Sequence, residues 1–297
     1  MGNKRSALVT GVAGFIGSNL ADQLITQGWE VWGIDDLSTG DKTNVNQKVR
    51  FFQEDVRNYP KVLNIFSRGK FDVCFHLAAL ARIQPSITDP VMAHSVNLTG
   101  SLNVIEACRR SKTKIIFAGS SSVYGTTDIL PTNERASKNP SSPYALQKLM
   151  VEQYLHLFGE LYALDFAICR FFNVYGPRQI MTGVYAAVVG IFLDQKSKGE
   201  LLTITGDGHK RRDFTHVEDI CDGLIIAANQ NSVGLEMNLG GGENISIKEL
   251  ADLISPNQNY LPDRQGEAEA TLCDNTIARS LGWKPKWNIK KYLEQIK

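Results

Sequence analysis

Long hydrophobic runs and an excess of one charge are both absent from this sequence. No apolar stretch approaches the roughly 20 residues that a helix needs to span a bilayer. The net charge of +1, with both signs mixed along the chain, offers no electrostatic case for binding nucleic acid or an anionic membrane. Glycines and a strand pattern interrupt the N-terminal segment, so no signal peptide is predicted there. These observations favour an ordinary globular protein.

Clustered cysteines and histidines are absent too. The five cysteines are isolated and lie in apolar or helical contexts, which predicts reduced core residues in a cytoplasmic protein: Cys74, Cys108, Cys169, Cys221 and Cys273. The five histidines are equally scattered, so we expect no metal site. No internal repeat or low-complexity tract is found. A chain of 297 residues can form one large or two medium domains with a substantial core.

A glycine-rich turn near the N-terminus is the first feature that indicates chemistry. Ser6–Val9 is predicted as a buried strand and Phe15–Gln27 as an amphipathic helix, with the turn Thr10–Ser18 joining them. Glycines allow a close approach of the backbone to phosphates, and the helix N-terminus offers free N–H groups. We therefore expect a pyrophosphate to contact Gly11, Gly14, Phe15, Ile16 and Gly17. The spacing differs from G-x-G-x-x-G, so a tight turn without a ligand stays open at this point.

Acidic residues follow the next two predicted strands. Glu30–Ile34 reads as a strand that ends in Asp35 and Asp36, and Asp35 lies 18 residues after Gly17. An acid at this distance is expected to bind the adenosine ribose hydroxyls and to repel a 2′-phosphate, which favours NAD over NADP. A third strand, Val49–Gln53, leads to Asp55 and Val56, which could approach the adenine. A surface turn is the alternative reading of the Asp35–Asp36 pair.

The strand and helix pattern continues in alternation. Phe71–His76 is predicted as a fourth strand, followed by Leu77, Ala78 and Ala79. The small side chains there allow the backbone to approach a cofactor closely. His76 is interpreted as a core residue with satisfied hydrogen bonds. Residues 90–111 are predicted as one long helix that contains Asn97, and Lys114–Ala118 as a fifth strand. This alternation predicts an α/β fold with a doubly wound parallel (Rossmann-type) sheet.

A serine cluster, a tyrosine and a lysine carry the candidate catalytic chemistry. Ser120, Ser121 and Ser122 follow the fifth strand, and Tyr144 and Lys148 open a helix four residues apart, so both side chains share one face. An ammonium near a phenol, with a nicotinamide cation close by, is expected to lower the pKa of the phenol from about 10 towards neutral. The tyrosine could then exchange a proton with a substrate hydroxyl during hydride transfer to or from NAD.

Together these motifs resemble the extended short-chain dehydrogenase/reductase family of nucleotide-sugar epimerases and dehydratases. The resemblance covers nearly the whole chain and includes these segments: T-G-x-x-G-x-x-G at 10–17, S-S-S-V-Y-G at 120–125, Y-x-x-x-K at 144–148, R-F-F-N-V-Y-G-P-R at 170–178, G-D-G at 206–208, R-D-F-T-H-V-E-D at 212–219 and L-G-W-K-P at 281–285.

The resemblance implies a role for each matching residue. Tyr144 would be the general acid/base, Lys148 would bind the nicotinamide ribose, and Ser120 would be the catalytic serine. Asn97 and Phe171 would lie on the cofactor side. The residues implied in binding the nucleotide sugar are Ser121, Ser122, Asn173, Arg212, Arg264, Glu267 and Thr271. Arginines suit a diphosphate because their forked donors bind two oxygens at once.

Departures from the family pattern are few. Phe171 replaces a more usual tyrosine, Glu267 a more usual aspartate, and the segment after Arg178 is short, which puts loop contacts with the substrate in doubt. The turn at 120–124 has no carboxylate, whereas the dehydratases carry one, so 4-epimerisation with retained NAD is expected. Thr271 falls where a bulky tyrosine excludes N-acetyl groups in UDP-hexose 4-epimerases, which favours UDP-GlcNAc/GalNAc or dual specificity.

The resemblance also implies an architecture and partners. Residues 1–170 would form the NAD-binding domain, with a returning segment near 212–240, and 171–297 the nucleotide-sugar lobe. The helices at 90–111 and 144–161 would pack into the four-helix bundle of a homodimer, with a monomer as the alternative. Other enzymes of the family, acting on uronic acids or as reductases, stay open, as does a non-enzymatic NAD sensor. Asp35 argues against an NADPH-consuming reductase.

Overall fold

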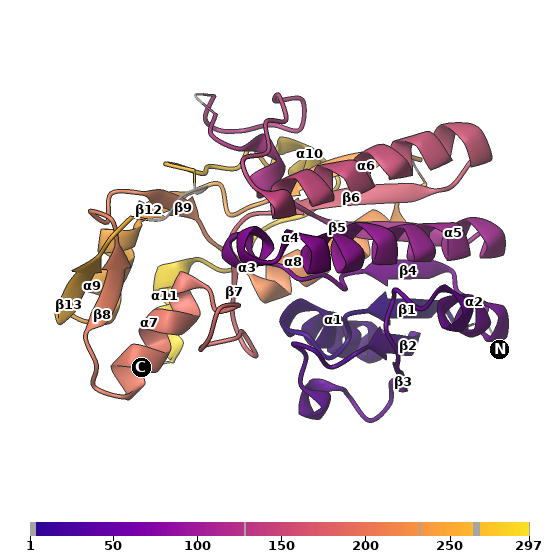
Figure 1. Ribbon diagram of the computed structural model, residues 1–297, viewed down its shortest axis with the longest axis horizontal. Helices are drawn as coiled ribbons and strands as arrows, with labels where there is room; N and C mark the ends of the chain where they lie inside the picture. The colour runs from indigo at the N-terminus through magenta and orange to yellow at the C-terminus, as the bar shows by residue number, and fades with distance from the viewer. Residues whose placement is uncertain (1–3, 128, 232, 264–267, 297) are drawn as a thin grey trace.

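The computed structural model describes residues 4–127, 129–231, 233–263 and 268–296. Figure 1 shows two lobes: a larger one on the right, which holds the N-terminus and the central sheet, and a smaller one on the left, which holds α7, α9 and α11. In the described parts of the chain, no helix is both long and apolar enough to cross a membrane.

The larger lobe is organised around one parallel sheet. Its strands, in the order in which they pair, are β11 (Leu235–Leu239), β6 (Phe166–Phe171), β5 (Lys114–Ser120), β4 (Val73–His76), β1 (Ser6–Thr10), β2 (Glu30–Asp35) and β3 (Arg50–Gln53). Every neighbouring pair is parallel. The chain winds outward from β1 in one direction through β2 and β3 and in the other through β4. The predicted doubly wound parallel sheet is therefore confirmed.

Helices cover both faces of the sheet because successive strand residues point to opposite sides. Ala7 and Val9 pack in a core with α1 (Phe15–Thr26) and α8 (Val217–Asn229). Leu8 packs in a second core with α2 (Tyr59–Arg68), α5 (Ser101–Ser111) and α6 (Pro143–Tyr162). All five residues of β1 are buried, because helices cover both faces of this strand. A strand buried on both faces has a continuous apolar sequence instead of an alternating one.

The long helix predicted at 90–111 is confirmed as one continuous helical segment, but its middle is π-helical. The segment consists of α4 (Pro90–His94), a π-helical stretch (Ser95–Gly100) and α5. Asn97 lies in the π-helical stretch, and its amide binds both the N–H and the carbonyl of Leu80, at 2.8 and 3.2 Å. Single π-turns inside helices are frequent at functional sites. Here the distortion directs a polar side chain at the segment that follows β4.

The smaller lobe has its own core of apolar residues from α7, β8, α9 and α11. Its elements are α7 (Val188–Ser197), β8 (Leu202–Thr205), β9 (Arg211–Asp213), β12 (Asn244–Ser246), α9 (Ile247–Ile254), β13 (Gln258–Leu261) and α11 (Ile289–Gln295). The strands form two separate pairs, β8 with β13 and β9 with β12. β7 (Val174–Tyr175) pairs with β10 (Thr215–His216), and α10 (Thr276–Ser280) packs near β11.

The chain crosses between the lobes more than once. After β9 and β10 it returns to the sheet through α8 and β11, and Trp283 is buried in the same core as these elements. We propose the domain division accordingly: residues 1–170 with the return near 212–240 as one domain, and the remainder of 171–297 as the lobe that covers it. The shorter described segments are η1 (Lys42–Asn44), α3 (Ile83–Thr88) and η3 (Ser121–Tyr124).

Candidate active site

A cavity of about 510 Å³ lies where the carboxyl ends of the sheet strands meet the smaller lobe. In open parallel sheets this edge is the usual position of a ligand. Most of the residues singled out from the sequence line it: Gly11, Gly14, Phe15, Ile16, Gly17, Asp35, Asp36, Val56, Leu77, Ala78, Ala79, Ser120, Ser121, Ser122, Tyr144, Lys148, Phe171, Asn173, Arg212 and Thr271. The fold thus brings together segments that are far apart in the chain.

The glycine turn has the shape of a phosphate cradle. Gly11 has φ +73°, and a Cβ on it would lie 2.9 Å from the backbone nitrogen of Ala78. A Cβ on Gly17 would lie 2.0 Å from the Gly11 carbonyl oxygen. The helix α1 begins at Phe15 without a side-chain cap and without an acidic residue in its first turn. Its first N–H groups are therefore available to an anion, so the turn fits the pyrophosphate of a dinucleotide.

The acid at the end of β2 is integrated into this cradle. Asp35 is buried, and its two carboxylate oxygens accept hydrogen bonds of 2.9 Å from the N–H groups of Ala13 and Leu37. Burial is the largest influence on this carboxyl and raises its pKa. Asp36 is less buried and accepts bonds from Ser38. Both acids line the cavity at the end where adenosine is expected.

Asp55 and Asn97, both predicted on the cofactor side, do not themselves line the cavity. The Asp55 carboxylate does not line the cavity, because it is paired with the guanidinium and the N–H of Arg57, with Oδ2 2.5 Å from one guanidinium nitrogen. Its neighbour Val56 does line the cavity. Asn97 does not line it either; its amide holds Leu80 and the Gln147 side chain. Both assignments stay predictions: the Asp55 carboxylate is in an ion pair with Arg57, and Asn97 holds Leu80, a residue of the cavity wall, which agrees with a role in ordering the cofactor side.

That segment is also fixed from its other side. The hydroxyl of Thr10 accepts bonds of 3.2 Å from the N–H groups of Leu77 and Ala78. His76 is almost fully buried, and its ring nitrogens lie 2.7 Å from the Thr10 hydroxyl and 2.8 Å from that of Ser101. The interpretation of His76 as a satisfied core residue is confirmed. Its hydrogen bonds tie β4 to β1 directly beneath the cavity.

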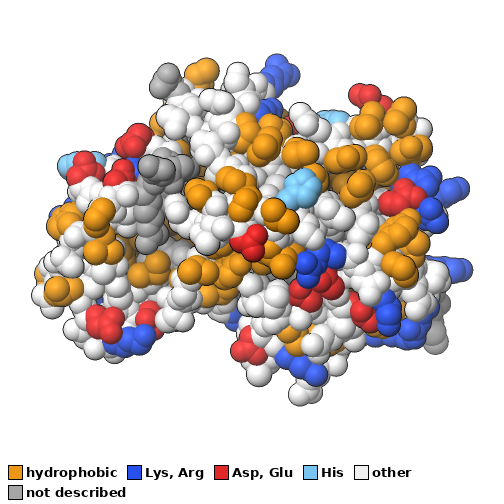
Figure 2. Space-filling model, in the orientation of Figure 1, with side chains coloured by type: hydrophobic (Ala, Val, Ile, Leu, Met, Phe, Trp, Pro, Cys, Tyr) orange, Lys and Arg blue, Asp and Glu red, His pale blue; other side chains and the backbone are white. Residues whose placement is uncertain are grey.

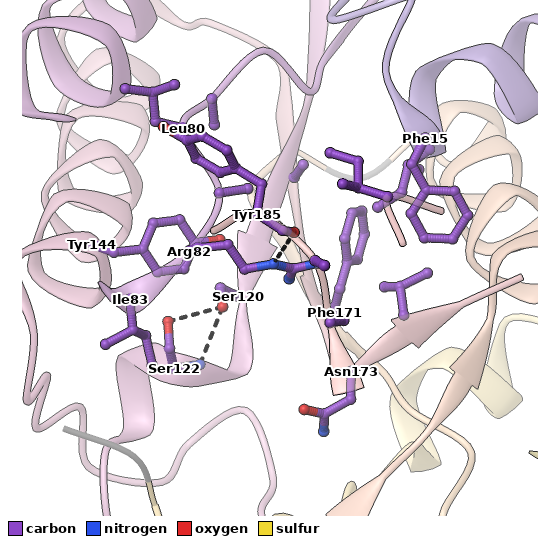
Figure 3. Close-up of a pocket in the computed structure, with 18 of the residues that line it drawn as sticks. Phe15, Leu80, Arg82, Ile83, Ser120, Ser122, Tyr144, Phe171, Asn173 and Tyr185 are labelled. Carbon is purple, nitrogen blue, oxygen red and sulfur yellow. Dashed lines mark hydrogen bonds between the residues drawn. The ribbon is translucent and has the colours of Figure 1, made fainter. Parts of the chain in front are cut away.

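The serine cluster follows β5 as a short 3₁₀ turn. The Ser120 hydroxyl lies 2.8 Å from that of Ser122 and accepts a hydrogen bond from its N–H. The turn is anchored by Tyr124, whose hydroxyl donates to the buried Asn238 side chain at 2.7 Å and accepts from Arg170 at 3.1 Å. Arg170 is in turn paired with the buried Glu152. The hydroxyls of Ser120 and Ser122 are thereby held at the cavity wall (Figure 3).

Tyr144 and Lys148 lie on one face of α6, as their spacing predicts. The Lys148 ammonium is buried, donates to the Ala118 carbonyl at 2.8 Å and lies 5.9 Å from the centre of the Tyr144 ring. Burial lowers the pKa of Lys148 to about 8. Pro143 opens the helix, and the Ser142 hydroxyl caps it by accepting from Ala145 N–H. The start of α6, and with it Tyr144, is therefore well defined.

The lowering of the Tyr144 pKa that we expect beside a bound nicotinamide cation stays a prediction, and the protein's own groups act on this pKa as follows. Burial is the largest influence and raises the pKa, while a hydrogen bond with Ser120 and the charge of Arg82 lower it. The Lys148 ammonium is occupied by the Ala118 carbonyl. Desolvation penalises the phenolate more than these two neighbours stabilise it. Besides Lys148, a second cation near the phenol is Arg82, which was not predicted from the sequence.

Several polar residues from the smaller lobe face the same cavity. Arg212 and Lys210 both line it, and Lys210 is 2.7 Å from Asp263. The Thr271 hydroxyl accepts bonds of 3.1 Å from the Asn173 amide and from the N–H of Asp213. Arg264 and Glu267 lie outside the described residues. The cavity therefore has cations, Lys210 and Arg212, where the smaller lobe lines it, and acids, Asp35 and Asp36, where β2 ends.

Arg82 and Tyr185 line the cavity but were not predicted from the sequence. Arg82 precedes α3, and its Nε donates to the Tyr185 carbonyl at 2.7 Å. Figure 3 shows its guanidinium between the rings of Tyr144 and Phe171 and above Ser120. The sequence signal for Arg82 was its position three residues beyond Ala79, in the segment that follows β4. Tyr185 had no signal, because it lies in an irregular segment.

Comparisons with known proteins agree on one family. A family model described as the NAD dependent epimerase/dehydratase family matches residues 7–240. The UDP-glucose 4-epimerase of Mycolicibacterium smegmatis is 38% identical over 293 residues, which cover 94% of this chain and 93% of that protein.

Two solved structures cover nearly the full length. A UDP-glucose 4-epimerase of Thermotoga maritima, solved with UDP-glucose, has a TM-score of 0.94 at 33% identity and covers 97% of this chain and 96% of its own. A UDP-N-acetylglucosamine 4-epimerase from Methanobrevibacter ruminantium, in complex with UDP-N-acetylmuramic acid, has a TM-score of 0.92 at 34% identity. The alignment covers 99% of this chain and 97% of that structure's chain.

Proposed function

Because this chain belongs to the NAD dependent epimerase/dehydratase family, we propose that it catalyses the NAD-dependent 4-epimerisation of a UDP-hexose. The observation that carries this proposal is the position of Tyr144 and Ser120 in the same cavity as the glycine turn. The carboxylates among the described lining residues are Asp35, Asp36 and Glu54, all at the ends of β2 and β3. Elimination of water would need an acid and a base beside the sugar, so this arrangement favours epimerisation over dehydration.

Each catalytic residue has one task in this reaction. Tyr144 takes the proton of the C4 hydroxyl while C4 is oxidised, and returns it when C4 is reduced. Ser120 holds the same oxygen, since its hydroxyl interacts with Tyr144. Lys148 is held by the Ala118 carbonyl where it can bind the nicotinamide ribose. NAD, when bound, supplies reversible acceptance of the C4 hydride, so the reaction needs no external oxidant or reductant.

The remaining lining residues are proposed to bind the two nucleotides. Gly11, Gly14 and Gly17 with the start of α1 would hold the NAD pyrophosphate, and Asp35 its adenosine ribose. Arg212, together with Lys210, would bind the diphosphate of the UDP-sugar. Thr271, a small residue in the cavity wall, leaves room for an N-acetyl group. The same proposal extends to Arg264 at the diphosphate and Glu267 at the uridine ribose.

We also propose a homodimer formed by α4, α5 and α6. Figure 2 shows apolar side chains gathered over this face. The exposed ones on α4 and α6 are Val91, Met92, Leu146, Leu157, Leu161 and Tyr162. Exposed apolar patches of this kind mark protein interfaces. Sedimentation at micromolar concentration tests it, and a monomer would contradict it. All five cysteines are buried and free, which supports the proposed cytoplasmic location.

The experiment that tests the proposed reaction needs no added reductant. Purified protein is incubated with UDP-glucose or with UDP-N-acetylglucosamine, first without and then with NAD, and the anomeric signals are followed by proton NMR. We expect the galacto epimer to form from at least one sugar, with no net change in NAD. If neither sugar is converted even after NAD is supplied, 4-epimerisation of neutral UDP-hexoses is wrong.

A further inference from the structure

Arg82 is placed in the cavity by two firm attachments of its backbone. Before it, the Asn97 amide binds the N–H and the carbonyl of Leu80 at 2.8 and 3.2 Å. After it, the Ser86 hydroxyl in α3 accepts a bond of 3.1 Å from the N–H of Tyr144. The start of α3 is thereby joined to the start of α6, and the Arg82 side chain extends into the cavity beside the Tyr144 ring (Figure 3). Its position relative to the catalytic tyrosine is therefore fixed by the fold.

The Arg82 guanidinium has no carboxylate within 4 Å among the residues that the structure describes. Its one hydrogen bond in that part of the chain is the 2.7 Å bond from Nε to the Tyr185 carbonyl. Other arginines of the protein are paired with acids, namely Arg57, Arg109, Arg110, Arg170, Arg178 and Arg211. Burial lowers the pKa of Arg82, as expected for a cation that leaves water without an anion. Such a charge is stabilised when a ligand supplies the anion.

The other cations of the cavity already have tasks. The Lys148 ammonium is held at the Ala118 carbonyl, and Lys210 lies 2.7 Å from Asp263. Arg212 is on the smaller lobe, where the diphosphate of the proposed substrate would bind. Arg82 is distinct from these because it interacts with Tyr144, the residue that marks the position of C4. The anion that Arg82 would meet therefore belongs to the sugar ring next to C4.

We propose that Arg82 binds a carboxylate carried by the sugar on an atom adjacent to C4, so that the substrate is an acidic UDP-sugar. This assignment rests on the proposed 4-epimerisation and narrows its substrate. A carboxylate can reach this position from C5, as in a hexuronic acid, or from an acidic ether on O3, as in N-acetylmuramic acid. The forked donors of arginine match either carboxylate. One of the similar structures above was solved with UDP-N-acetylmuramic acid.

Two matched pairs of substrates test the assignment. UDP-glucuronate differs from UDP-glucose in the carboxylate at C5, and UDP-N-acetylmuramate differs from UDP-N-acetylglucosamine in the acidic ether on O3. The rate of C4 epimer formation is measured by proton NMR for all four with the NAD-loaded wild-type enzyme, Arg82→Gln, Arg82→Lys and the control Arg68→Gln. Arg68 is an exposed arginine of α2 outside the cavity. NAD binding by each variant confirms that the fold is intact.

We expect the wild-type enzyme to prefer the acidic member of at least one pair. Arg82→Gln should lower kcat/KM for that acidic sugar by about 10- to 100-fold more than for its neutral counterpart, and this additional loss should appear chiefly in KM. Arg82→Lys should restore part of the loss because it keeps the charge, and Arg68→Gln should resemble wild type. The pair that shows the preference identifies the source of the carboxylate.

Other results would overturn the assignment in distinguishable ways. An equal rise in KM for all four sugars would mean that Arg82 binds the diphosphate that they share. A fall in kcat and an alkaline shift of the pH profile that are equal for all four sugars, with no additional loss for the acidic ones, would mean that Arg82 acts only through the pKa of Tyr144 and binds no carboxylate. Preference for the neutral sugars, unchanged by Arg82→Gln, would refute the carboxylate site and leave the 4-epimerase standing. Absence of any C4 epimer from all four would refute the proposed reaction itself.

Discussion

Replacing Gly17 by alanine should destroy the dinucleotide cradle. A Cβ at this position would lie 2.0 Å from the Gly11 carbonyl oxygen, 2.8 Å from its carbonyl carbon and 3.0 Å from the Cα of Val12. All three are backbone atoms, so no side chain can rotate away. To reach ordinary contact at 3.4 Å, the first turn of α1 and the Gly11 carbonyl must separate by about 1.4 Å.

The size of the effect follows from the bonds that this movement strains. The Gly11 carbonyl accepts from Gly14 N–H at 3.1 Å, and Gly11 N–H donates to Ile34 at 2.8 Å. Loss of both, at about 0.5–1.5 kcal/mol each, together with about 1–3 kcal/mol for overpacking, should destabilise the protein by about 2–6 kcal/mol. The phosphate-facing N–H groups move as well, so we expect NAD affinity to fall by at least about 100-fold.

Gly14→Ala is the matched control within the same turn. Its Cβ would lie 3.2 Å from the same Gly11 oxygen, and its backbone at φ −78° suits any residue. Only a few tenths of an ångström are needed there, so both losses should be much smaller. NAD binding is measured by titration of the cofactor-free protein, and stability by urea unfolding. If Gly17→Ala binds NAD within about threefold of wild type, or if Gly14→Ala is equally damaging, the cradle argument is wrong.

Three further outcomes are expected. Tyr144→Phe should reduce turnover by about 100-fold or more and leave NAD binding within about threefold, and retained turnover measured by NMR would contradict its role. Thr271→Tyr should reduce kcat/KM for N-acetylated sugars selectively, with Thr271→Val as the control for its two lost hydrogen bonds; an equal loss on UDP-glucose would oppose this. Burial lowers the pKa of His76 to about 3 from 6.5, so the folded state resists a proton that the unfolded chain accepts. The contribution of His76 to the free energy of unfolding is therefore complete above pH 6.5. It should decline as the pH falls towards 3, by at most roughly 5 kcal/mol in total. Urea unfolding across this range measures the decline, and a His76 ring that titrates above about pH 5 in the folded protein would refute it.

The central sheet could be predicted because each of its elements has a local signal. The apolar runs at β1, β4 and β5 and the amphipathic pattern of α1 depend on residues within one element. The predicted strand Phe71–His76 is shorter in the structure, beginning at Val73. The helix predicted at 90–111 is helical throughout, but its π-helical middle was not predicted, because that stretch depends on contacts of Asn97 with Leu80 and Gln147. Those partners are 17 and 50 residues away in the chain and leave no trace in the local pattern.

The smaller lobe was harder to predict for the same reason. Its strands have three or four residues each, and β8 pairs with β13 from the far end of the lobe. Short strands give too few residues to establish a period of two. Asp55 shows a different limit: its spacing after β3 suits a cofactor contact, but Arg57 two residues later takes its carboxylate. The approach of Asp55 to the adenine stays a prediction, and only the structure shows that its carboxylate is also in an ion pair.

Reaction type and substrate choice have different sources in this protein. The groups that we propose to act at C4 and on NAD lie at the ends of regular elements: the glycine turn after β1, the serines after β5 and the tyrosine in the first turn of α6. Such positions recur at fixed spacings, so a motif indicates the reaction. Arg82 and Tyr185 come from irregular segments whose meeting across the cavity depends on the Ser86 contact with α6 and on the smaller lobe. A single cation at this place decides which charge the sugar can carry, and only the structure shows that its guanidinium lies beside Tyr144 with no described acid to pair with it.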